Sequence, residues 1–200
     1  VDALRAAGAL GTEKSFISAY GVHVNVELPD LEAATLSRYL RAYALLQWWL
    51  VDSHHIDIAR RISPYIDLFT RDYLKHVLMH PNAGIDQILD DYLHFNPSRN
   101  RGLDLLPLLA SIDEEKVRSI VDDPRIKARP SFHYRLPDCR IEQSDWSLTV
   151  PWNSWLVVEK LAENDVWLQE LTEEFLSTER QRVLLDISRT SWVEYIDLWL

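Results

Sequence analysis

Two stretches of this 200-residue chain carry side chains whose types and spacing could do chemistry. The first is "GVHVNVELPD" (21–30), in which His23, Asn25 and Glu27 alternate with valines. Successive side chains of a β-strand point to opposite faces. The valines are therefore predicted to face a core, and the three polar side chains to share the other face. A strand that lines a polar site and an ordinary surface strand would both give this alternation.

The second stretch is basic and lies within an acidic protein. "RIKARPSFHYRLPDCRI" (125–141) contains five cationic side chains, namely Arg125, Lys127, Arg129, Arg135 and Arg140. If the segment is extended, the period of two places on one face Lys127, Arg129, Ser131, His133 and Arg135. Like charges on one face repel, and guanidinium groups match phosphate and carboxylate geometry. An anion site is one interpretation, and a solvated face paired with acidic helices is the other.

Arg99 and Arg101 lie in "NPSRNRGLD" (96–104), just before a predicted helix. The N-terminus of a helix and adjacent arginines both favour anions. This segment could therefore extend the anion site, although an ordinary polar loop would have the same composition.

Other combinations give weaker signals. His76 and His80 have the spacing of two metal ligands on a helix, but the glutamate of the HExxH motif is absent. Two surface histidines are the favoured interpretation. Cys139 and His133 could form a nucleophile and base, which one cysteine and one nearby histidine indicate only weakly. No Walker A, GxGxxG or GxSxG motif occurs.

The elements that must position these residues are mostly helical. Helical spacing and capping residues predict helices at 31–52, 65–79, 85–95, 98–112, 113–121, 149–176 and 180–200, with a helix ending near 3–8. Asn164–Asp165 is a candidate break within 149–176. A strand is predicted at 16–28, and a strand or bent hairpin at 127–142, where Pro130 and Pro137 limit regular pairing. This pattern predicts one α+β domain, with helices packed on a small sheet.

Composition narrows the classes of function. The net charge of −10 argues against a general nucleic-acid-binding role, which needs a basic face. The single cysteine excludes an internal disulfide and suits a reducing compartment, so a cytoplasmic location is expected. No apolar run reaches the length of a membrane span, and no membrane partner is expected.

Three motifs in order resemble those of the amidoligase family, which groups with glutamate–cysteine ligase and the glutamine synthetase-like carboxylate–amine ligases. "GVHVNVELP" is similar to the family's Gly–x–His–x–His/Asn strand, and a long hydrophobic helix follows it. "RNRGLDLLPLL" is similar to the Arg–x–x–x–Leu–Asn element. "SFHYRLPD", followed by "PWNSWLVVEKLA", is similar to the strand ending in Glu–x–Arg and the closing helix. The resemblance covers residues 18–165.

The resemblance implies a fold and a reaction. The fold would be a curved antiparallel sheet with helices outside, a half domain like that of glutamine synthetase. The reaction would join a small-molecule or peptide carboxylate to an amine, using ATP and an acyl phosphate. Mg²⁺ would bridge the phosphates to protein ligands, and arginines would stabilise the developing charge. A homo-oligomer is compatible with this resemblance.

The resemblance also implies roles for individual residues. Catalytic roles fall to His23, Asn25 and Arg135. Cofactor binding falls to Arg101 and Asp104, and the cationic stretch adds Lys127 and Arg129 as candidates. Metal binding falls to His23 and His133, and the alternation in 21–30 adds Glu27, which matches no family motif.

This chain departs from the family pattern at three points. His133 takes the place of the glutamate in Glu–x–Arg, which removes a hard oxygen ligand for Mg²⁺, and Asp104 takes the place of the asparagine. The family's Glu–x–Glu strand should precede residue 18 and is not found in residues 1–17. The chain is therefore expected to be the C-terminal part of a larger amidoligase-like domain, and to be inactive alone.

Two alternatives stay open. The chain could be a non-catalytic relative that acts in binding or assembly, with Trp152, Trp155 and Trp167 available to a partner. It could instead be a helical regulatory protein with an arginine-lined anion pocket, in which case replacing His23 or Asn25 by alanine would leave ligand binding unchanged.

Overall fold

The computed structural model describes residues 1–12, 21–181 and 189–200, with side-chain burial described as far as residue 180 before the second gap. Ten helices lie within these ranges: α1 (Asp2–Ala6), α2 (Ala33–Ser53), α3 (Ile58–Arg61), α4 (Arg71–Met79), α5 (Ile85–Phe95), α6 (Leu106–Ile112), α7 (Glu114–Ile120), α8 (Thr149–Ala162), α9 (Asp165–Gln181) and α10 (Arg189–Trp199). Three strands complete the described fold: β1 (Val24–Glu27), β2 (Leu103–Asp104) and β3 (Ser131–Tyr134). The predicted α+β class and the small antiparallel sheet are confirmed.

The sheet has the order β1-β3-β2, so its central strand is the last of the three in sequence. Both pairings are antiparallel. Asn25 pairs with His133 on one side of β3, and Asp104 pairs with the same His133 on the other side. Directly paired residues point to the same face of a sheet. One residue of each strand therefore contributes to a single polar row.

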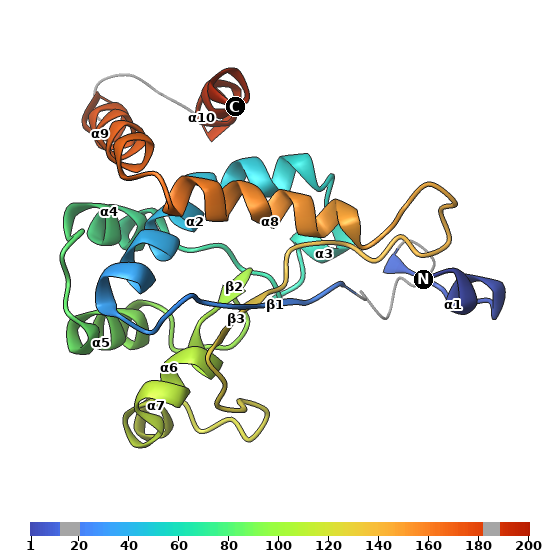
Figure 1. Ribbon diagram of the computed structural model, residues 1–200, viewed down its shortest axis with the longest axis horizontal. Helices are drawn as coiled ribbons and strands as arrows, with labels where there is room; N and C mark the ends of the chain where they lie inside the picture. The colour runs from blue at the N-terminus through green and yellow to red at the C-terminus, as the bar shows by residue number, and fades with distance from the viewer. Residues whose placement is uncertain (13–20, 182–188) are drawn as a thin grey trace.

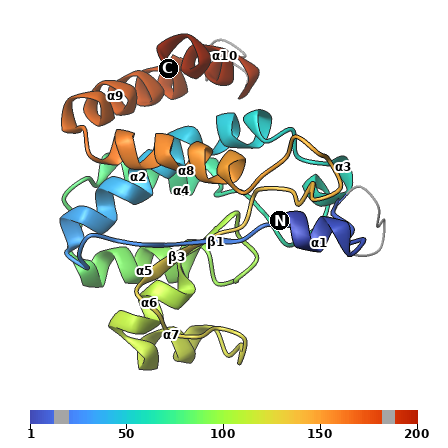
Figure 2. The same ribbon diagram turned by 45° about the vertical axis from the view of Figure 1, so that its right-hand side comes forward.

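The other face of the sheet is apolar and is covered by α2 and α8, which run side by side in both views (Figures 1 and 2). Tyr134 stacks near Tyr43 of α2 and Trp155 of α8, at ring-centroid distances of 6.2 and 5.2 Å. Phe132 makes the matching contacts one step along the strand. The core is centred on this layer, because Phe132, Tyr134 and Trp155 are all fully buried.

Helix α2 lies at the centre of the fold and packs against α4, α8, α9 and α10. A helix with neighbours on most sides needs apolar residues all around it, which accounts for its long hydrophobic run. Its buried Gln47 is satisfied by both backbone groups of Phe69: its amide nitrogen donates to the carbonyl at 3.1 Å, and its oxygen accepts from the N–H at 2.9 Å. Gln47 thereby fixes the connection that leads into α4.

Several predicted bounds were wrong for identifiable reasons. The helix predicted at 65–79 begins only at Arg71, because the Thr70 side chain caps it and Asp67 pairs with Arg101 in an extended bridge. The helix predicted at 98–112 begins at Leu106, because Leu103 and Asp104 pair with β3 instead. These segments follow tertiary pairing rather than local helical spacing.

Other predicted elements were too long. The strand predicted at 16–28 is β1, 24–27, and residues 13–20 lie outside the described part. Of the segment 127–142, only 131–134 is a strand, between the two prolines. The segment 149–176 forms two helices, α8 and α9, and the break lies at Asn164–Asp165, where the sequence offered one; Asn164 accepts a hydrogen bond from the Trp167 N–H at 3.0 Å. No helix in the described part is long and apolar enough to cross a membrane.

Candidate active site

The polar face of the sheet gathers most of the residues that the two chemical stretches predicted. We use the name polar face for the side chains of Asn25, Glu27, Asp104, Ser131 and His133 in the paired strands, together with those of His23 and Arg135 directly beside them. His23, Asn25 and Glu27 are exposed along β1, whereas Asp104, His133 and Arg135 are buried. The face therefore has an accessible rim and a buried, charged floor.

Three side chains of the polar face form a continuous hydrogen-bonded chain. His133 Nδ1 lies 3.3 Å from Asp104 Oδ2, and His133 Nε2 lies 3.0 Å from His23 Nδ1. The two imidazole rings meet edge to face, with centroids 4.7 Å apart. The other carboxylate oxygen of Asp104 accepts the backbone N–H of Leu106 at 3.0 Å. Both ring nitrogens of His133 and both oxygens of Asp104 are thus engaged within the protein.

His23 is the exposed end of this chain. The protein around its ring desolvates it, and the neighbouring His133, Arg135, Arg60 and Arg99 add to the effect, so that the pKa of His23 falls to about 4. The residue as a whole still has a solvent-exposed edge. At neutral pH the ring is consequently uncharged and faces the rim of the site.

Positive charge dominates the floor beside His133. Arg135 is buried and donates from Nη1 to the carbonyl of Arg99, while its Nε has no hydrogen-bond partner in the described part of the chain. Burial lowers the pKa of Arg135, and the positive charges of the neighbouring Arg99 and Arg60 lower it further. The Asp104 carboxylate has the opposite effect and raises it. Arg129 donates to Asn25 Oδ1 at 2.8 Å, and its Nε is likewise buried without a partner there. Unmatched guanidinium groups of this kind favour an anionic ligand.

Arg101, which was predicted to contact the anion, lies away from the polar face. Arg101 points into the fold, where it donates to the carbonyls of Leu68 at 3.1 Å and Phe95 at 3.4 Å. Arg99 is the arginine beside the polar face, and the spacing Arg–x–x–x–Leu–Asp also begins at Arg99. Lys127 and Arg129 precede β3 rather than extending it, so the single cationic face predicted for 127–135 is not formed. The role of each residue in cofactor binding stays a prediction.

The residues present do not fit a Mg²⁺ site. In the described ranges, no three His, Cys, Asp or Glu side chains are placed to hold one metal ion. Both ring nitrogens of His133 and both carboxylate oxygens of Asp104 already make hydrogen bonds within the protein. The side-chain atoms of this face that remain as candidate metal ligands are His23 Nε2 and the Glu27 carboxylate. Mg²⁺ requires near-octahedral oxygen coordination, and this face does not provide it.

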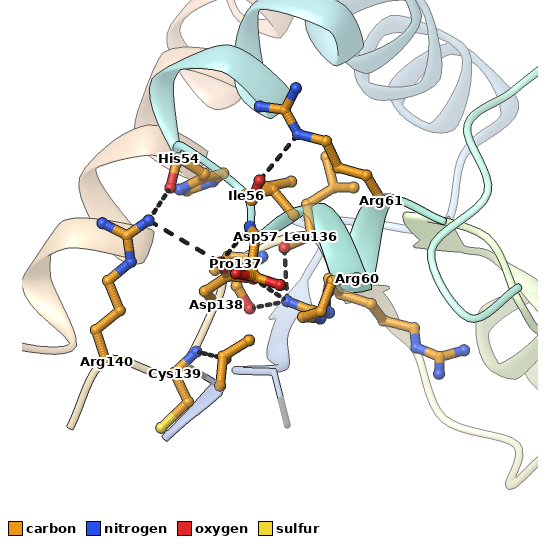
Figure 3. Close-up of polar contacts among 12 residues, drawn as sticks. His54, Ile56, Asp57, Arg60, Arg61, Leu136, Pro137, Asp138, Cys139 and Arg140 are labelled. Atoms are coloured by element: carbon orange, nitrogen blue, oxygen red, sulfur yellow. Dashed lines mark hydrogen bonds and ion pairs between the residues drawn. The ribbon is translucent and has the colours of Figure 1, made fainter. Parts of the chain in front are cut away.

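A buried ion pair holds the strand that carries the floor. Arg60 of α3 pairs with Asp138 at 2.9 Å, with both side chains at most 4% exposed. The same guanidinium donates to the carbonyls of Leu136 and Pro137 (Figure 3). It also donates to the carbonyl of Arg135. Asp138 in turn accepts the Asp57 N–H at 2.7 Å. We call this arrangement the Arg60 clamp, and no motif in "HIDIARRIS" indicated it.

The glycine of the "GVHVNVELP" motif is explained by the Arg60 clamp. Gly21 forms a bridge with Asp138, and the Val22 N–H donates to Pro137. A Cβ atom on residue 21 would lie 2.5 Å from Nη2 and 2.7 Å from Cζ of Arg60. Glycine is required because the guanidinium lies against the backbone just before His23.

The predicted partner-binding tryptophans separate into two groups. Trp155 is fully buried against Phe132 and Tyr134, so it belongs to the core and is not available to a partner. Trp152 and Trp167 are 46% and 45% exposed.

The weaker candidates of the sequence also lie apart from the site. His76 bonds to Asp91 at 2.7 Å, as a local surface pair away from the polar face. Cys139 is half-buried, with its N–H bonded to Thr12 Oγ1 at 2.9 Å.

Gly21→Ala should destabilise the protein by about 1–3 kcal/mol, because the new methyl group overlaps the Arg60 guanidinium. Urea denaturation measures the free energy of unfolding. Gly84→Ala is the matched control, since a Cβ atom there meets nothing within 4 Å. Equal effects of the two substitutions would show that the Arg60 clamp does not require a glycine.

His54 supplies a pH test of the same region. Its Nε2 lies 2.6 Å from the Tyr134 hydroxyl, and burial, followed by Arg140 and Arg60, lowers the pKa of His54 to about 4. The unfolded chain, with an ordinary pKa near 6.5, binds more protons between these values, so stability must fall as the pH drops from 7 to 5. His54→Gln should reduce this fall by on the order of 1–2 kcal/mol.

The measurement is urea denaturation at pH 7 and pH 5, comparing the difference for each protein. His94→Gln, at an exposed position, is the control and should behave as the wild type does. A fall of the same size in His54→Gln would mean that His54 is not held neutral.

Comparison with known proteins identifies the family. A family model described as "Putative amidoligase enzyme" matches residues 1–157, which include β1, β2, β3 and most of α8. No curated protein and no solved structure matches the chain significantly. The matched region contains the whole polar face and the Arg60 clamp, and it covers well over half of the sequence. The chain belongs to the amidoligase family.

Proposed function

We propose that this protein is an ATP-dependent carboxylate–amine ligase whose reaction takes place on the polar face. The observation that supports the proposal most is the buried Arg135, which has no carboxylate partner within hydrogen-bonding distance in the described part and lies beside Arg99. A buried guanidinium without a counter-ion is costly unless an anion binds to it. Family membership supports amide-bond formation as the reaction class.

In the proposed reaction, a carboxylate oxygen of one substrate attacks the γ-phosphorus of ATP, and ADP leaves. The product is an acyl phosphate, whose carbonyl carbon is then attacked by an amine. The carbon–nitrogen bond forms, the carbon–oxygen bond to phosphate breaks, and the amine loses a proton. Arg99, Arg129 and Arg135 would stabilise the charge that develops on the phosphoryl oxygens, which is the main contribution that a protein makes to phosphoryl transfer.

ATP and a carboxylate and an amine, either free or within a peptide, are the proposed ligands. Mg²⁺ ordinarily neutralises the phosphates of ATP in such reactions. Because the described side chains do not provide an oxygen ligand set, we route no step of this proposal through the ion.

The absence of a three-residue metal set in the described part also favours a second candidate, a relative that keeps the sheet and binds its ligand without turnover. Binding without ADP formation would identify this function. The two candidates therefore make opposite predictions in one assay.

Incubation of the full-length natural protein with ATP, Mg²⁺ and a panel of amino acids and short peptides should release ADP only when both a carboxylate and an amine are present. Arg135→Gln should lower the rate of ADP release at least 100-fold, since it removes the positive charge that would stabilise the reacting phosphoryl group. Lys160→Gln is the control, because Lys160 is exposed on α8 and is not among the charges that act on Arg135. ADP release that no carboxylate–amine pair stimulates would contradict the ligase function.

A further inference from the structure

The hydrogen-bonded chain from Asp104 to His23 has a direction. An ionised carboxylate only accepts hydrogen bonds. Asp104 accepts the Leu106 N–H with one oxygen, so its other oxygen requires a hydrogen on His133 Nδ1. A neutral histidine has one ring hydrogen, and in His133 the Asp104 carboxylate holds that hydrogen on Nδ1. A neutral His133 has its lone pair on Nε2.

The lone pair on His133 Nε2 determines the state of the next ring. The 3.0 Å contact between His133 Nε2 and His23 Nδ1 then needs a hydrogen on His23 Nδ1. A neutral His23 carries its remaining lone pair on Nε2, which has no hydrogen-bond partner in the described part of the chain. His23 is exposed, so this lone pair is available to a ligand at the rim.

The two sides of the polar face differ in what they can bind. Arg99, Arg129 and Arg135 offer only N–H donors, which suit carboxylate and phosphate oxygens. His23 Nε2 and the Glu27 carboxylate, along the exposed edge of β1, offer acceptors. Of the ligands in the proposed reaction, the amine is the one whose reacting atom carries N–H donors.

We propose that Asp104 is a positioning residue that acts through His133 to hold His23 in its Nδ1–H tautomer, so that His23 Nε2 accepts a hydrogen bond from the amine substrate. The amine as ligand rests on the proposed function, whereas the tautomer rests on the geometry alone. His23 directly precedes β1 and Arg135 directly follows β3, so both lie next to the Val24–Tyr134 pair at the end of the register. The amine would thus be held next to the anion that it attacks.

Exchanging the carboxylate for an amide should reverse the direction of the chain. In Asp104→Asn, the amide oxygen can keep the Leu106 N–H, and the amide nitrogen then donates to His133 Nδ1. His133 would carry its hydrogen on Nε2 and donate to His23 Nδ1. His23 would become the Nε2–H tautomer, a donor that repels an amine N–H. Loss of function through a wrong histidine tautomer is an established consequence of such an Asp→Asn exchange.

The test is long-range ¹H–¹⁵N NMR of protein labelled with [¹⁵N]histidine, which reports the tautomer of each ring. The chain has seven histidines, and the His23 signals are those lost in His23→Gln. We expect Nδ1–H for His23 in the wild type and Nε2–H in Asp104→Asn. The matched control is Asp91→Asn, which alters the separate Asp91–His76 pair and should leave His23 unchanged.

Binding is tested in the same spectra with methylamine, added at millimolar concentration to the wild type, and independently with MgCl₂. The proposal expects methylamine to shift the His23 Nε2 signal in the wild type, with at least a tenfold weaker response in Asp104→Asn. A wild-type Nε2–H tautomer, a tautomer unaffected by Asp104→Asn, or a response to MgCl₂ in place of methylamine would overturn it. Because the wild-type measurement needs neither Asp104→Asn nor turnover, it is decisive even if Asp104→Asn does not fold or the ligase function fails.

Discussion

The pairing of β3 with both β1 and β2 is the constraint on which the rest of the structure depends. Because β3 is the central strand, its His133 is paired with Asn25 on one side and Asp104 on the other. The same pairing turns Phe132 and Tyr134 toward α2 and α8, where the core lies. A shift of the register by one residue would move every polar side chain into the core. The site and the core are therefore fixed by a single set of backbone hydrogen bonds.

The short strand β3 is supported beyond its end by the Arg60 clamp. β3 has only four residues, fewer than a typical strand, and the three carbonyls that follow it all bond to one buried guanidinium. Breaking a buried pair such as Arg60–Asp138 typically costs about 3–5 kcal/mol, because it leaves an uncompensated charge. The Arg60 clamp thus couples α3, which has no residue on the polar face, to the position of Arg135 and, through Gly21, to that of His23.

Much of this arrangement could be predicted from alternation in two stretches of sequence. The period of two correctly placed His23, Asn25 and Glu27 on one face, and His133 and Arg135 on one face, because a strand with a buried side tolerates no other arrangement. Sequence spacing could not predict which polar groups bond to each other. The contact between His133 and Asp104, the two positions where this chain departs from the family pattern, joins residues 29 apart in sequence. It follows only from the register of β2.

Where sequence patterns indicated the wrong position for a residue or carried no signal for it, the position again depends on contacts between segments that are distant in sequence. Arg101 and Arg99 are two positions apart, and only the bridge between Asp67 and Arg101 shows that Arg101 turns inward. Arg60 carried no signal, since an arginine in a short helix is ordinary until its buried carboxylate partner is known. Trp155 could not be distinguished from Trp152 by composition, because burial there depends on which face of α8 meets the sheet.

The central claim is that the polar face supports formation of an acyl phosphate, and the fate of the carboxylate oxygen tests it most directly. A carboxylate substrate labelled with ¹⁸O, chosen as one that supports ADP release, is incubated with ATP and an amine. The account predicts that the released inorganic phosphate carries one ¹⁸O atom from the carboxylate, because that oxygen bridges carbon and phosphorus before the amine attacks. Phosphate without the label, together with amide product, would contradict it.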